Sequence, residues 1–223
     1  RSEGVMSFGS DGFALYFTSS RTIDGANVGA RIYKATQEPD DEGEESGWTK
    51  ITLSGVCGDS VSVGHPALTP DGGRLYFVTD MLLGGYGGKD IWYVENTGGG
   101  WGEPVNAGEL INTSGDEMFP FVRENGELYF ASNGHYGFGG LDIYCIQDED
   151  GKQSLKHLSA PINSSADDFG IAFKFGTENG LFTSSRTGRG DNIYEFSFIP
   201  QRLRVKVLAE NAITEKAIPQ TEI

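Results

Sequence analysis

The sequence predicts an all-β protein, a β-propeller built from four-stranded antiparallel blades. Glycine is abundant, with 33 residues against 8 prolines in a chain of 223, and long runs with helical periodicity are missing. Both features favour many short strands joined by turns. The third observation is an internal repeat, in which four segments share one order of strands, turns and loops. These repeats span about residues 4–54, 65–108, 118–160 and 169–198.

Each repeat opens with a short strand and a tight turn. The opening strands are expected at residues 5–8, 66–68, 119–122 and 170–173. The turns that follow carry Asp-Gly or Asn-Gly pairs, which tolerate the positive φ angles of tight hairpins. These pairs are Asp11-Gly12, Asp71-Gly72, Asn125-Gly126 and Asn179-Gly180.

An aromatic-rich second strand, a Gly-rich loop and a third strand complete the common part of each repeat. The second strands are expected at residues 15–19, 75–77, 128–132 and 181–184, and the third strands at 32–33, 90–93, 142–144 and 192–194. A weaker fourth strand is expected in three repeats, at residues 48–53, 103–107 and 154–158. The fourth repeat lacks it.

The spacing of the repeats distinguishes a propeller from other all-β folds. The equivalent residues Phe17, Phe77, Phe130 and Phe182 are separated by steps of 60, 53 and 52 residues. Periods of about 40–50 residues with four strands per unit are typical of propeller blades, and regular spacing argues against a β-sandwich. Because the fourth repeat is short, the ring is expected to be completed by a terminal strand or by blades upstream of Arg1.

A change of pattern near Pro200 predicts a domain boundary. The propeller is expected to cover residues 1–199, and residues 200–223 are expected to form a linker and the first strands of a β-sandwich domain. Residues 202–207 alternate between charged and apolar side chains, as a half-buried strand does.

The composition excludes several classes of partner. The formal net charge of -15 argues against nucleic acid and against anionic membrane surfaces, since both require clustered Lys and Arg. No apolar stretch approaches the ~20 residues that span a bilayer, so no direct membrane insertion is expected. The acidity serves solubility, or it marks a cation site or a basic partner. Cys57 and Cys145 match no metal or redox spacing, and whether they pair is left open.

A search for catalytic chemistry finds no recognisable motif. The sequence has no His-Glu-x-x-His, no Gly-x-Ser-x-Gly and no phosphate-binding glycine loop. Residues 148–151 begin like a calcium loop, but Ser159 stands where a bidentate Glu is needed, so a hairpin turn is predicted there. The three histidines have no neighbouring Cys or second His. We therefore expect no catalytic residue, no metal and no cofactor, and a chain that is not an enzyme.

The topology of a blade predicts where partners bind. The second-to-third-strand loops and the links between blades lie on one face of a propeller, and here the loops are long and Gly-rich while the links are acidic. We expect a partner or a cation to dock on this face, with a merely solvated surface as the alternative. The candidate residues are Asp59, Asp116, Glu117, Asp167, Asp168, Asp90 and Asp142.

Two groups of recurring residues have a structural explanation as well as a functional one. Asp90 and Asp142 each precede an Ile, and a carboxylate there can accept backbone N–H bonds that close the preceding Gly loop. The strand residues Tyr16, Tyr76, Tyr129 and Tyr144 resemble a sugar-binding platform, but packing between blades also needs their bulk. The structural role is favoured for both groups.

The second half of the chain resembles a known repeat family. Three stretches carry the resemblance: Gly-Asp-Glu-Met-Phe-Pro-Phe at residues 115–121, Leu-Tyr-Phe-Ala-Ser-Asn-Gly-His at 128–135, and Gly-Gly-Leu-Asp-Ile-Tyr at 139–144. Residues 167–171 and 188–194 repeat parts of the pattern. They resemble the TolB-type, WD-repeat-like propeller repeats of OmpA-family proteins of Bacteroidetes. The first repeat departs from this pattern, because Arg31 precedes its Ile-Tyr pair where the family has Asp.

The resemblance implies a cell-envelope function. Family members place a helical tetratricopeptide region before the propeller, and a carboxypeptidase-regulatory-like sandwich and a peptidoglycan-binding OmpA-like domain after it. PorE-like components of the type IX secretion system have this layout, and residues 203–223 resemble the opening strands of the sandwich. The implied protein is periplasmic and associated with the outer membrane. Peptidoglycan would be bound only through a domain absent from this chain.

We therefore expect a non-catalytic scaffold that binds other periplasmic or outer-membrane proteins. The alternative is a propeller that recognises or gates glycan or peptide substrates for a hydrolase domain outside this chain. A propeller fold alone does not distinguish the two, because it supports many functions.

Overall fold

The computed structural model describes residues 3–9, 12–20, 22–23, 26–27, 29–39, 45–53, 56, 61–80 and 83–199. These residues form antiparallel strands joined by turns and loops, which confirms the predicted all-β class. None of the described segments forms a helix long and apolar enough to cross a membrane. The predicted boundary at Pro200 and the sandwich strands beyond it lie outside the described residues.

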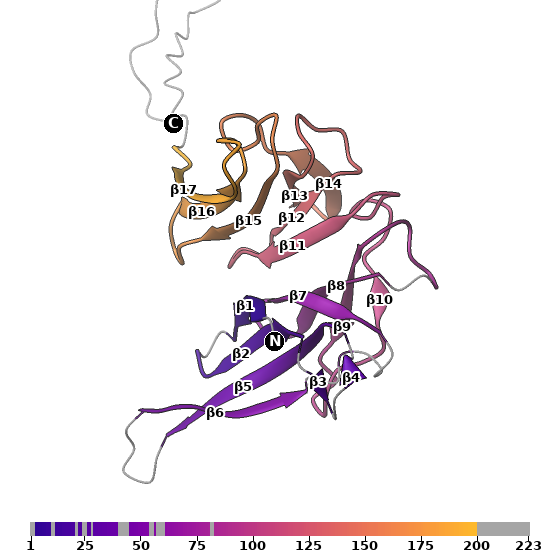
Figure 1. Ribbon diagram of the computed structural model, residues 1–223, viewed down its shortest axis with the longest axis vertical. Helices are drawn as coiled ribbons and strands as arrows, with labels where there is room; N and C mark the ends of the chain where they lie inside the picture. The colour runs from indigo at the N-terminus through magenta and orange to yellow at the C-terminus, as the bar shows by residue number, and fades with distance from the viewer. Residues whose placement is uncertain are drawn as a thin grey trace, which may run out of the picture.

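Four of the five sheets in the described residues correspond to the four repeats (Figure 1). Blade 1 contains β1 (Glu3–Phe8), β2 (Ala14–Ser19), β5 (Arg31–Pro39) and β6 (Glu45–Leu53). Blade 2 contains β7 (Val63–Leu68), β8 (Arg74–Thr79), β9 (Asp90–Glu95) and β10 (Val105–Asn106). Blade 3 contains β11 (Glu117–Val122), β12 (Leu128–Ser132), β13 (Asp142–Glu149) and β14 (Lys152–His157). Blade 4 has three strands, β15 (Asp168–Phe173), β16 (Asn179–Ser184) and β17 (Asn192–Ser197).

Several observed strands are longer than predicted, above all β5 and β13, and three further differences concern the pattern of strands and turns. The loop of blade 1 holds an unpredicted two-stranded hairpin, β3 (Thr22–Ile23) with β4 (Ala26–Asn27). In blade 2 the fourth strand is shorter than predicted, because β10 has only two residues. The third difference concerns the first turn of blade 4.

The predicted turn at Asn179-Gly180 is wrong, because both residues already belong to β16. The turn lies earlier, where the Thr177 N–H donates to the Lys174 carbonyl at 3.1 Å. Gly176 occupies its third position with φ +69°, the positive angle that a type II turn requires. In the other three blades the glycine of the predicted pair has positive φ, as expected. The predicted hairpin turn at 148–151 is also confirmed, since Asp150 and Gly151 both have positive φ.

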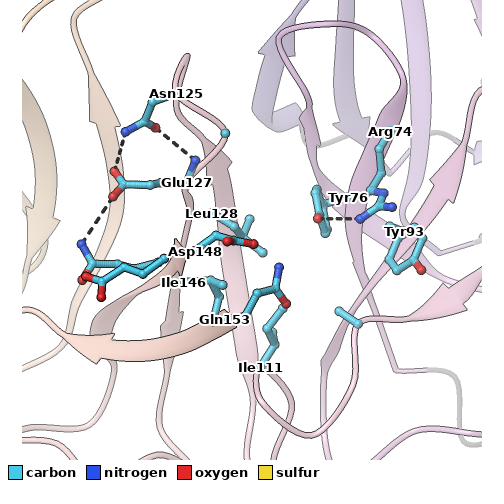
Figure 2. Close-up of a pocket in the computed structure, with 14 residues that line it drawn as sticks. Arg74, Tyr76, Tyr93, Ile111, Asn125, Glu127, Leu128, Ile146, Asp148 and Gln153 are labelled. Atoms are coloured by element: carbon cyan, nitrogen blue, oxygen red, sulfur yellow. Dashed lines mark hydrogen bonds between the residues drawn. The ribbon is translucent and has the colours of Figure 1, made fainter. Parts of the chain in front are cut away.

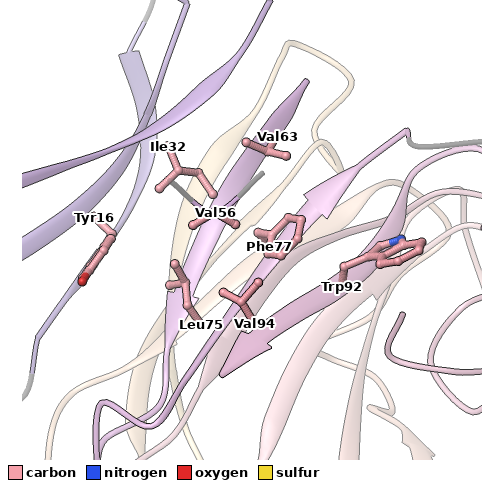
Figure 3. Packing of buried hydrophobic residues seen from close by; sticks show 8 residues of the cluster. All are labelled: Tyr16, Ile32, Val56, Val63, Leu75, Phe77, Trp92 and Val94. Atoms are coloured by element: carbon pink, nitrogen blue, oxygen red, sulfur yellow. The ribbon is translucent and has the colours of Figure 1, made fainter. Parts of the chain in front are cut away.

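The hydrophobic core consists of three layers, each between two consecutive blades. Tyr16 and Ile32 of blade 1 meet Leu75, Phe77 and Val94 of blade 2 in the first layer (Figure 3). The other layers lie between blades 2 and 3 and between blades 3 and 4. Successive residues of a strand point to opposite faces, so a central blade buries both. All five residues of β12 are accordingly buried.

Three of the four strand tyrosines are core residues, as predicted. Tyr16, Tyr129 and Tyr144 are buried in the inter-blade layers. Tyr76 differs, because it is only half-buried and lines a cleft described below. Cys145 is a buried free thiol, and burial raises its pKa to about 12, so it is held as the protonated thiol. Cys57 lies outside the described residues.

The first strands of consecutive blades pack against one another along the axis of the ring, and each is distorted at the same position. The pairing register of each first strand shifts where a residue has positive φ: Val5, His65, Phe119 and Gly170. At two of these bulges the backbone N–H reaches the preceding blade. The N–H of His65 donates to Thr18 Oγ1 at 2.9 Å, and that of Phe119 to His65 Nδ1 at 3.2 Å. The bulges therefore join the blades to one another.

The rings at the bulges form a column along the axis, and they keep His65 neutral. The centroids of His65 and Phe119 lie 4.4 Å apart, and those of Phe119 and Phe169 lie 4.8 Å apart. Burial, assisted by the charge of Lys89, lowers the pKa of His65 from 6.5 to about 4. The folded state therefore binds this proton less readily than the unfolded chain does.

We expect His65 to make stability depend on pH. As the pH falls from about 6.5 to about 4, the unfolded chain gains the proton first, so the free energy of unfolding decreases, by up to about 3 kcal/mol. His65→Asn should remove this dependence, because Asn tolerates positive φ and does not titrate. Urea unfolding of both proteins across this pH range measures the difference. If the free energy of unfolding changed with pH in the same way in the wild type and in His65→Asn, His65 would not be the source of the pH dependence.

The face of blade 4 that points away from blade 3 is exposed. Leu181 and Ile193 lie on this face, and both are exposed to solvent. Their equivalents in blade 3, Tyr129 and Ile143, are buried in the layer that blade 4 covers. How the ring is completed beyond blade 4 stays a prediction.

Candidate functional site

The second-to-third-strand loops and the inter-blade links lie side by side, as the sequence predicts for one face of the ring. The N–H of Gly88 donates to the carbonyl of Gly115 at 2.8 Å, and the N–H of Glu117 donates to that of Lys89 at 2.6 Å. In the next blade the Asp168 N–H donates to the Leu141 carbonyl at 2.7 Å. We call this side of the ring the loop face, formed in blades 2 and 3 by residues 83–89, 112–117, 133–141 and 163–168.

Glycines allow the loops to approach the links this closely. A Cβ atom at Gly87 would overlap the carbonyl oxygen of Thr113, and one at Gly139 would overlap that of Ala166. The Gly-rich composition of the loops is therefore explained by packing within the ring.

Asp116 and Asp167 are the surface carboxylates of the two links. Asp116 Oδ1 accepts the Lys89 N–H at 2.8 Å, and Asp167 Oδ1 accepts the Leu141 N–H at 2.9 Å. The Lys89 ammonium also lies 3.6 Å from the Asp116 carboxylate. Both aspartates hold a loop in place, and both have exposed surface, so their contact with a partner stays a prediction.

Glu117 and Asp168, also predicted for the partner-binding face, lie in the interior. Glu117 accepts hydrogen bonds from the Thr113 N–H and hydroxyl at 2.8 and 2.6 Å and from the Ser132 hydroxyl at 2.6 Å. Asp168 accepts bonds from the Ser164 N–H and hydroxyl at 2.6 and 2.8 Å and from Arg186 at 2.7 Å. Since neither side chain has exposed surface, direct contact with a partner is excluded.

Asp90 and Asp142 are buried as well, and they close the loops in the way favoured from the sequence. Asp90 Oδ2 accepts the Tyr86 N–H at 2.6 Å, and Asp142 Oδ2 accepts the N–H groups of Phe138 and Gly139. The prediction that these two residues belong to the surface site is corrected, because their carboxylates lie beneath the loops. Asp59, the remaining candidate, lies outside the described residues.

The buried carboxylates fix the loop residues whose side chains point outward. Asp90 and Asp142 bind the backbone of Tyr86 and Phe138, and the Tyr144 hydroxyl donates to the carbonyl of Tyr136 at 2.8 Å. The exposed fractions of the four large apolar side chains on these loops are 89% for Leu83, 49% for Tyr86, 101% for Tyr136 and 56% for Phe138. The charge-based prediction missed them, although aromatic residues among glycines in both loops are a usable signal.

The opposite side of the ring carries a cleft between blades 2 and 3. Its volume is about 560 Å³, and its two walls are drawn in Figure 2. Arg74, Tyr76 and Tyr93 form the wall on blade 2, and polar side chains of blade 3 face them. None of the described residues predicted for the partner-binding face lines this cleft.

Comparison with known proteins identifies structures of similar architecture. No family model and no curated protein sequence matches the chain. TolB from Acinetobacter baumannii has a similar structure, with a TM-score of 0.56 and 13% identity over 88% of this chain and 41% of TolB. A puromycin-hydrolyzing peptidase of Mycobacterium tuberculosis follows, with a TM-score of 0.49 and 15% identity over 88% of this chain and 27% of the peptidase.

A third match is the Hadza microbial sialidase Hz136, with a TM-score of 0.46 and 13% identity over 88% of this chain and 44% of the sialidase. The chain spans less than half the length of each of these three proteins. At such low identity the similarity to TolB concerns architecture alone. The chain has a TolB-like β-propeller fold.

Proposed function

We propose that this chain is a non-catalytic interaction module that binds a protein partner through its loop face. The observation that carries the proposal is the set of four exposed apolar side chains, Leu83, Tyr86, Tyr136 and Phe138, on two equivalent loops. Buried groups fix the backbones of Tyr86, Tyr136 and Phe138. Groups of large apolar side chains exposed on a soluble protein commonly mark interaction sites.

The rigidity of the loops favours tight binding. A flexible loop loses conformational entropy when a partner orders it, whereas a loop already held by hydrogen bonds loses less. Tyrosine and phenylalanine supply large contact areas with few rotatable bonds, and aromatic residues are enriched at energetic hot spots. The buried aspartates thus prepare Tyr86 and Phe138 for contact.

The charge around these side chains indicates the chemistry of the partner. Asp116 and Asp167 lie on the same face, and the whole chain carries a formal net charge of -15. An apolar pocket bordered by Lys or Arg would complement this surface and would be steered towards it. We therefore expect a partner with a basic rim around an apolar centre.

The roles of the buried acids support the absence of catalysis. Glu117, Asp168, Asp90 and Asp142 accept backbone or side-chain hydrogen bonds that hold the fold. Within the described part of the chain, no group of three or more His, Cys, Asp or Glu is placed to hold a metal ion. An acid that is buried under its own loop is poorly placed to reach a substrate.

The sequence resemblance to propellers of OmpA-family proteins supplies the cellular setting of the proposal. In that setting the module belongs to a periplasmic protein associated with the outer membrane, of the kind found in the type IX secretion system. Its partners are then other periplasmic or outer-membrane proteins. Peptidoglycan would be bound by a separate domain.

Substitution of the loop aromatics tests the proposal. A photo-crosslinking amino acid at Leu83 in intact cells should trap the partner, and affinity is then measured with the purified pair. Tyr136→Ser combined with Phe138→Ser should weaken binding at least about 30-fold, as expected when hot-spot side chains worth 2 kcal/mol or more are lost. Both side chains are exposed, so the thermal midpoint should stay near that of the wild type.

Phe175 provides the matched control, because it is an exposed aromatic residue in the first turn of blade 4, on the other side of the ring. Phe175→Ser should leave the affinity unchanged. If crosslinks form from position 175 and not from position 83, or if only Phe175→Ser weakens binding, the loop face is the wrong surface.

A further inference from the structure

The cleft between blades 2 and 3 is a pocket with side chains of both blades in its walls, on the side opposite the loop face. Strands β8 and β9 supply one wall, while the first turn of blade 3 and the β13–β14 hairpin supply the other. Its volume of about 560 Å³ lies within the range of about 300–1,000 Å³ that is usual for small-ligand sites.

The wall on blade 2 combines aromatic surface with a compensated charge. The guanidinium carbon of Arg74 lies 4.1 Å from the ring centroid of Tyr93 and 5.8 Å from that of Tyr76. Arg74 donates to the Tyr76 hydroxyl at 3.2 Å and to the Glu95 carboxylate at 2.8 Å. The Tyr93 hydroxyl has no hydrogen-bond partner among the described residues, so it remains free for a ligand.

The wall on blade 3 is made of amides and carboxylates. Glu127 accepts hydrogen bonds from Asn125 at 2.9 Å, Tyr129 at 3.0 Å and Gln147 at 3.4 Å. Burial raises the pKa of Glu127, but these hydrogen bonds outweigh it and leave the pKa lowered, so the carboxylate is ionised. The Gln153 amide, which also lines the cleft, makes no hydrogen bond within the described residues.

Comparison with the neighbouring interface shows why this cleft is open. Between blades 1 and 2, Trp101 packs edge-on against Tyr16 with ring centroids 5.9 Å apart. Trp101 lies between β9 and β10. In blade 3 the end of β13 and the start of β14 place the polar Asp148 and Gln153 beside the cleft (Figure 2). One interface is filled by an indole ring, and the next is left open and polar.

We propose that this cleft binds a short, neutral saccharide. A sugar ring has an apolar C–H face, which suits the ring of Tyr76 because Arg74 already stacks on Tyr93, and it has a rim of hydroxyl groups that both donate and accept hydrogen bonds. Amide, carboxylate and guanidinium groups pair with such hydroxyls. Leu128 and Ile146 add apolar surface beside the polar groups. This proposal does not depend on the loop face.

The charges in the cleft select against an acidic sugar. Arg74 is paired with Glu95, so its charge is compensated within its own wall. Asp148 and Glu149 line the opposite wall and are exposed. Neither carboxylate forms an ion pair within the described residues, so the negative charge of an anionic saccharide would be repelled.

Protein-observed NMR with defined sugars tests the proposal. Maltotriose, cellotriose and triacetylchitotriose are titrated separately into the ¹⁵N-labelled chain. At least one should shift the amide signals of Tyr93, Gln147 and Gln153 in a saturable manner. Gln153→Ala should weaken that binding about 2- to 10-fold, the effect of one hydrogen bond.

Gln153→Trp supplies the stronger variant, because it places an indole in this interface as Trp101 does in the neighbouring one. It should weaken binding at least about tenfold by filling the cleft. Ser154→Trp is the matched control: Ser154 is the next residue of β14, so it points to the opposite face of the sheet, and affinity should be unchanged.

Three results would overturn the saccharide assignment. The first is the absence of saturable shifts with all three sugars, and the second is binding that Gln153→Trp leaves intact in a folded protein. The third is occupation of the cleft by an acetylated trilysine peptide in place of the sugars, which would make it a peptide site. Tyr136→Ser with Phe138→Ser should not change sugar binding, so failure of this proposal and failure of the loop-face proposal are distinguishable.

Discussion

Replacing Phe130 by alanine is expected to lower the free energy of unfolding by about 3–5 kcal/mol, the usual effect of truncating a buried phenylalanine. Phe130 is fully buried in the layer between blades 2 and 3, and its ring stacks on Tyr144 with centroids 5.8 Å apart. Alanine leaves a cavity that the neighbouring strands of β12 cannot collapse to fill. Many domains are stable by only about 5–15 kcal/mol, so this single change threatens folding.

Chemical denaturation followed by tryptophan fluorescence measures the effect. Phe175→Ala is the control, because that ring is exposed and its loss should change the stability by no more than about 0.5 kcal/mol. An unfolding midpoint for Phe130→Ala equal to that of the control would contradict the packing of blade 3 between its neighbours.

The sequence predicted the strands well because the repeat constrains them four times over. Tyr129 and Phe130 are neighbours in β12, and one belongs to the layer with blade 4 and the other to the layer with blade 2. A strand buried on both faces reads as a continuous apolar run, and the same run recurs in each repeat. The turn of blade 4 was predicted wrongly because its Asn-Gly pair lies after the turn, at the start of β16, whereas the equivalent pairs of the other repeats lie in the turn itself.

The direction of the acidic side chains could not be predicted in the same way. Asp116 and Glu117 are adjacent in sequence, yet one is at the surface and the other is fully buried, and Asp167 and Asp168 repeat this difference. Adjacent residues of an extended chain point to opposite sides, so a net charge assigned to a link overstates its surface charge. The prediction from charge therefore assigned four carboxylates to the surface of the loop face, although they are buried beneath it.

The cleft could not be predicted from a single repeat, because residues of two blades line it. Whether the interface beside Tyr76 is open is decided by residues of β13 and β14, which are distant from Tyr76 in sequence. Trp101 follows β9 in blade 2, whereas the end of β13 and the start of β14 carry acidic and amide residues in blade 3. The difference between Trp101 and these polar residues predicts an open cleft only when the structure shows that they occupy equivalent places in the two blades.

Asp168 provides the second large effect, since its replacement by alanine should destabilise the protein by about 3–5 kcal/mol, as does the loss of a buried carboxylate held by an ion pair and by further hydrogen bonds. Its carboxylate joins three parts of the structure: the link at Ser164, the first strand of blade 4, and Arg186 after β16. Alanine would leave the Ser164 N–H and the Arg186 guanidinium without that acceptor. Unfolding in urea measures the change.

Asp167→Ala is the control for this substitution, because the adjacent carboxylate is exposed and accepts the single Leu141 N–H bond. It should reduce stability by only about 0.5–1.5 kcal/mol. Combining Asp168→Ala with Arg186→Ala should cost less than the sum of the two single changes, since each already removes the contact between them. Strict additivity would show that the two side chains do not act together. If Asp167→Ala destabilised the protein more than Asp168→Ala, the exposed carboxylate rather than the buried one would anchor blade 4 to the rest of the ring.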